Sequence, residues 1–132
     1  MAIDIINPPE LHDPVPFGYS HLARTRGELV FVAGQYDSGA DGQPTSDDFA
    51  TQVEAAFVNL GKALAAVGLG YADVAVLRTF IVGHDLDKLA VLGRKIAELW
   101  GGKPPVQTLL GVAALALPAM QFEVDAVAIR PQ

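Results

Sequence analysis

The chain has no cysteine among its 132 residues, which excludes a disulfide framework, a thiolate nucleophile and a cysteine-based metal site. Charge is also scarce: charged residues make up 18%, and the nine lysines and arginines form no cluster. A net charge of −6 argues against a nucleic-acid partner, because phosphate binding needs a concentrated basic surface. The chain shows no signal-peptide pattern, and no apolar run approaches the roughly 20 residues of a membrane helix. We therefore expect a cytoplasmic protein with no nucleic-acid and no membrane partner.

Apolar residues, by contrast, make up 51% of the chain, and its length fits one domain over residues 1–132 with a sizeable core. After a proline-rich arm over 8–18, we expect a hairpin of strands near 19–24 and 28–34, with its turn at Arg26-Gly27. Periodicity then predicts helices and further strands: helices near 46–67 and 86–100, and strands near 73–82, 105–112 and 120–129. This order predicts an α+β domain with both helices on one face of the sheet.

The expected helices carry signals at their ends. Thr45 or Ser46 can cap the first helix, and Gly68 ends it at a position where a left-handed residue is usual. Asp85 or Asp87 can cap the second helix. The first helix repeats apolar residues at spacings of three and four: Phe49, Val53, Phe57, Leu60, Leu64 and Val67.

The strands are apolar on both faces. In "LVFVAG", residues 29–34, both alternating sets of side chains are apolar, and the strands near 73–82 and 105–112 behave similarly. Two helices can cover only one face of such a sheet, so the other face needs a cover that the chain does not supply. We therefore predict self-association.

Familiar catalytic and metal-binding motifs are missing. His12, His21 and His84 lack metal-ligand spacing, and no HExxH pattern occurs, so we interpret them as surface or loop residues and expect no metal site. There is no GxSxG nucleophile elbow and no Walker-type phosphate loop. We expect no cofactor.

Two polar residues stand out in the last two strands. Alternation in "QFEVDAVAI" places Phe122 and Val124 on the core face and Glu123 on the opposite face, which self-association would bury. Gln107 interrupts the apolar strand "PVQTLLGV", and we expect it to share that outer face with Glu123. A carboxylate and a carboxamide at a subunit interface could hold a small ligand, or could form an interface hydrogen bond.

Several stretches taken together resemble the RidA/YjgF family: "INPPEL", "GYSHL", "GELVFVAGQ", "FATQVEAAFVNLGKALAAVGLGYADV", "RTFIVGHDLDKL" and "LPAMQFEVDAVA". They cover nearly the whole chain in the family's order. The resemblance implies a homotrimer of chorismate-mutase-like α+β subunits, with a mixed sheet lining a central barrel and ligand clefts between subunits. It also implies an activity, the hydrolysis of reactive enamines and imines to 2-keto acids and ammonia.

The family's substrate-binding arginine is the main point of departure. The family strand carries Pro-x-Arg-Ser/Thr, and its arginine grips the substrate carboxylate with a bidentate fork. The same register here is Pro105-Val106-Gln107-Thr108, so Gln107 takes the arginine's place, and a carboxamide supplies no charge-assisted fork. The family's water-activating glutamate matches Glu123, the candidate catalytic base.

Other family positions are partly retained. The family's loop tyrosine matches Tyr19, and its Ser-Gly-Gln matches Ala33-Gly34-Gln35. A cleft asparagine of the second helix corresponds to Gly93. We therefore expect substrate-binding roles for Tyr19, Gly34, Gln35 and Gln107 in a site that is present but rebuilt.

Three functions follow from this resemblance. The first is a trimer that binds or hydrolyses a small metabolite not anchored by a carboxylate, with the 2-imino-acid deaminase activity lost or altered. The second is an active enamine/imine deaminase, of the 2-iminobutanoate/2-iminopropanoate type, in which Arg24, Arg26 or Arg78 anchors the substrate. The third is a ligand-binding trimer without turnover. Net acidity and the absence of a paired histidine or lysine cluster argue against a ribonuclease.

Overall fold

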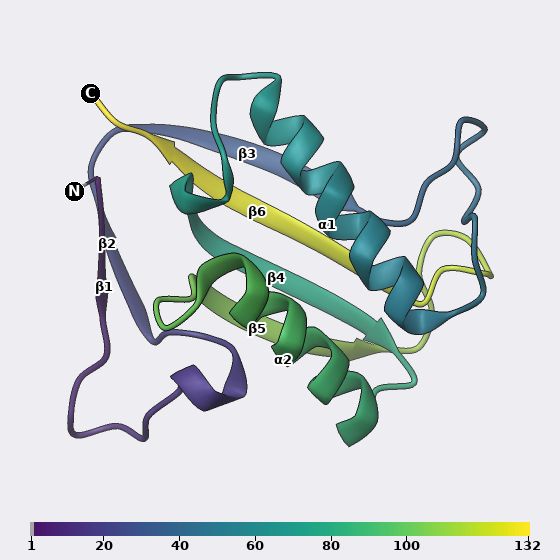
Figure 1. Cartoon of the computed structure of the whole chain (residues 1–132), viewed down its shortest axis with the longest axis horizontal. Helices are drawn as coiled ribbons and strands as arrows, with labels where there is room; N and C mark the ends of the chain where they lie inside the picture. Colours follow the sequence, from purple (N-terminus) through teal and green to yellow (C-terminus); the bar gives the residue numbers. More distant parts are fainter. Residues whose placement is uncertain (1) are drawn as a thin grey trace.

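Two sheets and two long helices make up the computed structural model, which describes residues 2–132. The larger sheet is mixed and has the strand order β3-β6-β4-β5, in which β4 and β5 run parallel and the other neighbours antiparallel. Its strands are β3 (Glu28–Gln35), β4 (Val74–Val82), β5 (Val106–Val112) and β6 (Phe122–Arg130). Both helices, α1 (Phe49–Ala65) and α2 (Leu86–Trp100), lie on one face of this sheet, as expected (Figure 1).

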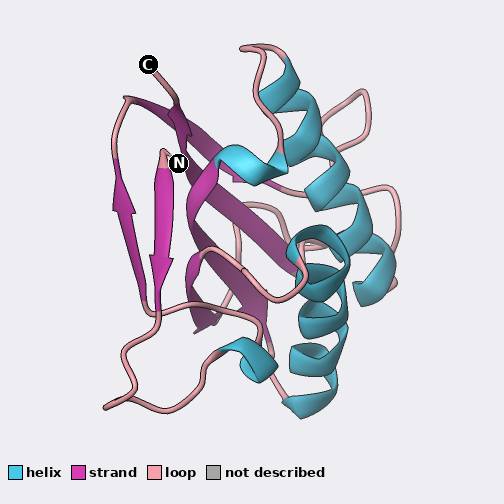
Figure 2. Cartoon of the chain, turned by 60° about the vertical axis from the view of Figure 1, so that its left-hand side comes forward, coloured by secondary structure: helices cyan, strands magenta, loops and turns pink. Residues whose placement is uncertain are grey.

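The expected hairpin of the strands near 19–24 and 28–34 is wrong. Strand β2 (Leu22–Thr25) pairs instead with β1 (Ile3–Ile6) in a separate two-stranded sheet, which Figure 2 shows on the side of the large sheet away from the helices. Gly27 explains the break, because its φ is +128° and a Cβ there would lie 2.2 Å from the Arg130 carbonyl oxygen. The chain enters the large sheet only after Gly27. Strand β2, which precedes Gly27, lies outside that sheet and pairs with β1, which lies on the other side of the arm in the sequence.

Helix α1 begins later than its sequence suggests. Asp48 caps it by accepting a hydrogen bond from the Thr51 amide at 2.9 Å. Thr45 and Ser46 belong to the preceding loop instead: both backbone amides donate to the buried Asp37 carboxylate at 2.9 and 3.0 Å, and the Ser46 hydroxyl accepts from the Asp48 amide at 3.0 Å. The buried carboxylate thus fixes the loop that leads into the helix.

The other helix ends agree with the sequence. Gly68 has a φ of +74°, just beyond the end of α1, and the Leu69 amide returns to the Leu64 carbonyl at 2.9 Å. Asp85 caps α2 by accepting from the Lys88 amide at 2.8 Å. Two 3₁₀ turns, Val15–Phe17 and Tyr71–Asp73, complete the regular structure.

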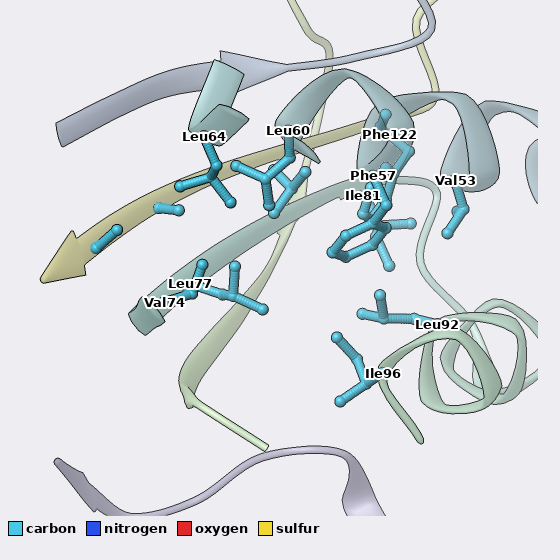
Figure 3. Packing of buried hydrophobic residues seen from close by; sticks show 14 residues of the cluster. Val53, Phe57, Leu60, Leu64, Val74, Leu77, Ile81, Leu92, Ile96 and Phe122 are labelled. Atoms are coloured by element: carbon cyan, nitrogen blue, oxygen red, sulfur yellow. The ribbon is translucent and has the colours of Figure 1, made fainter. Parts of the chain in front are cut away.

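The core lies between the helices and the large sheet. Phe57, Leu60 and Leu64 of α1 are fully buried and pack with Phe122 of β6 and Leu77 of β4, as Figure 3 shows. The apolar periodicity of the first helix therefore predicts its core face as far as Leu64, whereas Val67 lies beyond the end of α1 and is 40% exposed. No helix in residues 2–132 has the length and apolarity to cross a membrane.

The face of the large sheet away from the helices exposes apolar side chains. Phe31 is 73% exposed and Leu29 is 54% exposed, and both lie on β3 opposite residues of β6. Farther across the same face, the Arg78 guanidinium lies 5.6 Å from the centre of the Phe80 ring and pairs with Asp125 at 2.6 Å. A single copy of the chain thus exposes an apolar surface to water. The prediction of self-association rests on such a surface.

Candidate functional site

Gln107 lies on the helix side of the sheet. In the parallel register it stands opposite Leu77, whose side chain is fully buried in the core. Its Oε1 accepts a hydrogen bond from the Thr79 hydroxyl at 2.9 Å, and its Nε2 donates to the Gly18 carbonyl at 2.8 Å. The carboxamide therefore joins β5 to both β4 and the N-terminal arm.

The expectation that Gln107 and Glu123 share the outer face is wrong. Glu123 stands opposite Phe80 in the register of β4 and β6, and Phe80 in turn stands opposite Leu110 of β5. Leu110 is three residues from Gln107, so strand alternation puts these two side chains on opposite faces. The pattern of one strand gives two alternating sets of residues, but only the pairing with a neighbour assigns each set to a face.

The N-terminal arm extends in the structure to residue 21 and so includes Tyr19. Hydrogen bonds on both sides of Tyr19 hold the arm to β5 and to Pro105, just before it. The Gly18 carbonyl accepts from Gln107, and the Ser20 amide donates to the Pro105 carbonyl at 3.1 Å. Gly18 has a φ of +88°, and a Cβ there would lie 3.6 Å from the Cα of Gly93 on α2. The arm thus packs closely on α2, and Tyr19 is held over the edge of the sheet.

A cavity of about 330 Å³ lies where the arm, α2 and β5 meet. Apolar side chains form most of its wall, and the polar groups come from one tyrosine, one carboxamide and one threonine. The lining residues are Phe17, Tyr19, Leu89, Leu92, Gln107, Thr108 and Leu109. No arginine, lysine or carboxylate is among them. The structure therefore brings Tyr19 and Gln107 to one small uncharged cavity. A mostly apolar wall with a few polar groups is typical of small-molecule sites.

Three other expected site residues lie elsewhere. A Cβ at Gly34 would lie 2.2 Å from Glu123 Oε1, so the absence of a side chain at Gly34 makes room for the Glu123 carboxylate. Burial raises the pKa of Glu123 above its usual value, and the neighbouring Asp125 charge adds to this effect. Gln35 stands opposite Val124, which is buried on the helix side, and its Nε2 donates to the Ala33 carbonyl at 3.0 Å.

The three arginines considered as alternative anchors do not line this cavity. Arg24 pairs with Asp4 at 3.2 Å, and Arg26 lies exposed beyond the end of β2. Arg78 makes a bidentate contact with Asp125 on the outer face. The space beside Gly93 on α2 is unfilled, because a Cβ there would meet nothing within 4 Å.

The arm also brings two histidines together, contrary to the expectation that the chain has no paired histidines. The rings of His12 and His21 have centroids 5.0 Å apart, and Tyr19 lies between them in the chain. His12 Nε2 is 2.8 Å from the Tyr19 hydroxyl. Their spacing in the sequence gives no signal of this, because the two residues meet only through the irregular fold of the arm. Within residues 2–132, no group of three or more histidines or carboxylates is placed to hold a metal ion.

Known proteins are similar to this chain in both sequence and fold. Residues 12–130 match the family described as Endoribonuclease L-PSP. The chain belongs to this family, also called the RidA/YjgF family. The RutC family protein YjgH of Escherichia coli K12 is 35% identical over 115 residues, which cover 86% of this chain and 84% of YjgH.

Solved structures of RidA/YjgF proteins agree with the chain over almost its whole length. YyfB of Yersinia pestis, described as a Rid family protein of unknown function, is 34% identical with a TM-score of 0.92, covering 98% of this chain and 100% of YyfB. A structure of protein YjgH is 30% identical with a TM-score of 0.71, covering 100% and 99% of the two chains. The fold expected from the sequence, two helices on a mixed sheet, is thus confirmed.

Proposed function

We propose that this RidA/YjgF protein is a homotrimer that binds or hydrolyses a small uncharged metabolite in a cleft between subunits. The 2-imino-acid deaminase activity of the family's archetypes is lost or altered. One observation carries the proposal: Gln107, which the resemblance aligns with the family's arginine, lines an uncharged cavity and is hydrogen-bonded to Thr79 and Gly18.

The loss of a charged fork disfavours anionic substrates. A hydrogen bond that involves a charged group contributes about 1.5–3 kcal/mol, so its absence weakens carboxylate binding by about 10- to 150-fold. Gln107 has both ends of its carboxamide engaged already, which leaves one N–H to donate. The apolar wall formed by Leu89, Leu92 and Leu109 favours a neutral ligand instead.

The arrangement of the candidate residues supports a ligand cleft between subunits. Tyr19 and Gln107 lie on the helix side of the sheet, whereas Gly34 and Glu123 lie together on the outer face. One small ligand can contact both groups only if a second copy of the chain supplies one of them. In the trimer we propose, the exposed outer faces of three sheets line a central barrel, which buries Phe31 and Leu29.

Glu123 is the proposed base. Burial raises the pKa of the Glu123 carboxylate, which makes it a stronger base than an ordinary carboxylate. As the water oxygen bonds to the imine carbon, Glu123 takes one water proton and the C=N electron pair moves to nitrogen, which then receives this proton to give a carbinolamine. Glu123 next takes the remaining hydroxyl proton and delivers it to the amino nitrogen while the C=O bond forms and the C–N bond breaks. Ammonia leaves, one water is consumed and the carboxylate is restored.

The test compares imines that differ in one group. An amino-acid oxidase generates 2-iminobutanoate, and an amine oxidase generates a carboxylate-free imine from propylamine. We expect the native protein to accelerate decay of the carboxylate-free imine and Glu123→Gln to abolish this, since the amide keeps the shape but loses the base.

Each other result decides between the functions. Acceleration of 2-iminobutanoate decay by the native protein would contradict the proposal and support an active deaminase. Acceleration of neither imine would favour the ligand-binding trimer without turnover. Full activity in Glu123→Gln would remove this residue from the chemistry.

A further inference from the structure

Tyr19 and His12 form a hydrogen-bonded pair at the cavity. The Tyr19 hydroxyl lies 2.8 Å from His12 Nε2, and Tyr19 is part of the cavity wall. The His12 ring also meets Phe17, another wall residue, edge to face at a centroid distance of 5.8 Å. His12 is not itself a lining residue, but it contacts two residues that are, Phe17 and Tyr19.

His21 holds His12 in this place. His21 Nε2 lies 2.9 Å from the His12 carbonyl oxygen, and because a carbonyl only accepts, this nitrogen carries the hydrogen. The His21 amide in turn donates to Asn7 Oδ1 at 2.7 Å. Hydrogen bonds therefore hold both the backbone and the ring of His12, although the side chain is exposed to water.

A hydroxyl group has one hydrogen, and the hydrogens on the two His12 nitrogens decide where it points. A neutral imidazole with its hydrogen on Nδ1 accepts the tyrosine hydrogen at Nε2, which leaves only the hydroxyl lone pairs for a ligand. An imidazolium donates at both nitrogens and cannot accept, so the tyrosine hydrogen turns away from it. The same tyrosine then donates to a ligand.

We propose that the cavity binds an uncharged ligand through the Tyr19 hydroxyl, and that protonation of His12 converts Tyr19 from a hydrogen-bond acceptor into a donor toward that ligand. This inference rests on the ligand cavity of the proposed function, but not on any catalytic turnover. Ligands with a carbonyl or imine acceptor bind better when His12 is charged, and ligands with an N–H or O–H donor bind better when it is neutral.

Few other groups can take part in this titration. In the described part of the chain, the titratable side chains in contact with His12 are Tyr19 and His21. Asp13 follows in the sequence, and its carboxylate accepts from the Val15 amide at 3.1 Å. His84 lies at the far end of β4, beside Gly111, and so provides a control.

Two five-membered rings of similar size test the proposal: cyclopentanone, which only accepts, and pyrrole, which only donates. Each is titrated into the native protein at about pH 5.5 and about pH 8.5, on either side of the range in which imidazole changes charge. Binding is followed by the ¹H–¹⁵N amide shifts of Thr108 and Leu109. We expect cyclopentanone to bind about 2- to 10-fold more tightly at the lower pH and pyrrole at the higher pH, as the net contribution of one hydrogen bond allows.

The variants separate the possible outcomes. His12→Gln and Tyr19→Phe should each remove the opposite pH dependences of the two probes, whereas His84→Gln should keep them. Binding that is independent of pH in the native protein, or a pH dependence that survives His12→Gln, would overturn the inference and leave the cavity as a ligand site. If neither probe shifts Thr108 or Leu109 at either pH, both this inference and the proposed ligand cavity fail.

Discussion

Replacing Gln107 with leucine should destabilise the fold, because the carboxamide connects three segments of the chain. The substitution keeps a side chain of similar length but removes the hydrogen bonds to the Gly18 carbonyl and from the Thr79 hydroxyl. Thr79 is fully buried, so its hydroxyl loses its partner where water cannot replace it. Each hydrogen bond contributes about 0.5–1.5 kcal/mol, and an unsatisfied buried group costs about 1–3 kcal/mol. We expect Gln107→Leu to lower the free energy of unfolding by about 2–4 kcal/mol.

Urea denaturation at one fixed protein concentration measures this loss, since assembly would make stability depend on concentration. The matched variant is Thr79→Val, which removes the hydroxyl while conserving volume. The double variant should lose about 1 kcal/mol less than the sum of the two single variants, because neither partner is then left alone. A loss below about 0.5 kcal/mol in Gln107→Leu, or strict additivity, would refute the structural role that we assign to this carboxamide.

Three further results are expected. Phe57→Ala should cost about 3–5 kcal/mol of unfolding free energy, measured by the same denaturation, because the ring is fully buried in the core. Light scattering should give three times the 13.9 kDa chain mass for the native protein and for Leu86→Glu, but a smaller mass for Phe31→Glu; a native monomer would contradict the trimer. Because the folded pKa of Glu123 is raised, its contribution to stability is lost as the pH rises above its ordinary value of 4.5. As the pH rises through this range, the unfolding free energy of Glu123→Gln should therefore increase relative to that of the native protein. A difference between the two that does not change with pH would contradict the raised pKa.

The sequence predicts the elements of the large sheet and both helices because their signals are local. Asp85 and Gly68 mark helix ends through bonds within a few residues, and the periodicity of α1 identifies Phe57 as core. The pairing of β2 was wrong because it depends on β1, some twenty residues away, and on the close approach of Gly27 to β6. Contacts of this kind leave no periodic pattern in the chain.

The sequence names candidate site residues but gives no information on their arrangement. Tyr19 and Gln107 meet because the arm folds back on β5, and the sequence between them gives no sign of that contact. The face of Gln107 depends on its register with Leu77 of another strand. The sequence indicates His12 only as a surface or loop residue, since the folded arm alone brings its ring to the Tyr19 hydroxyl.

The claim that Gln107 limits activity on 2-imino acids is tested most directly by restoring a cation. The decay of 2-iminobutanoate is followed with the native protein, with Gln107→Arg and with Gln107→Lys, which supplies a charge without the planar fork. We expect no acceleration by the native protein, at least about a 10-fold gain in kcat/KM for Gln107→Arg over any residual native activity, and a smaller gain for Gln107→Lys. Native hydrolysis that is already fast, and that arginine does not increase, would contradict the account.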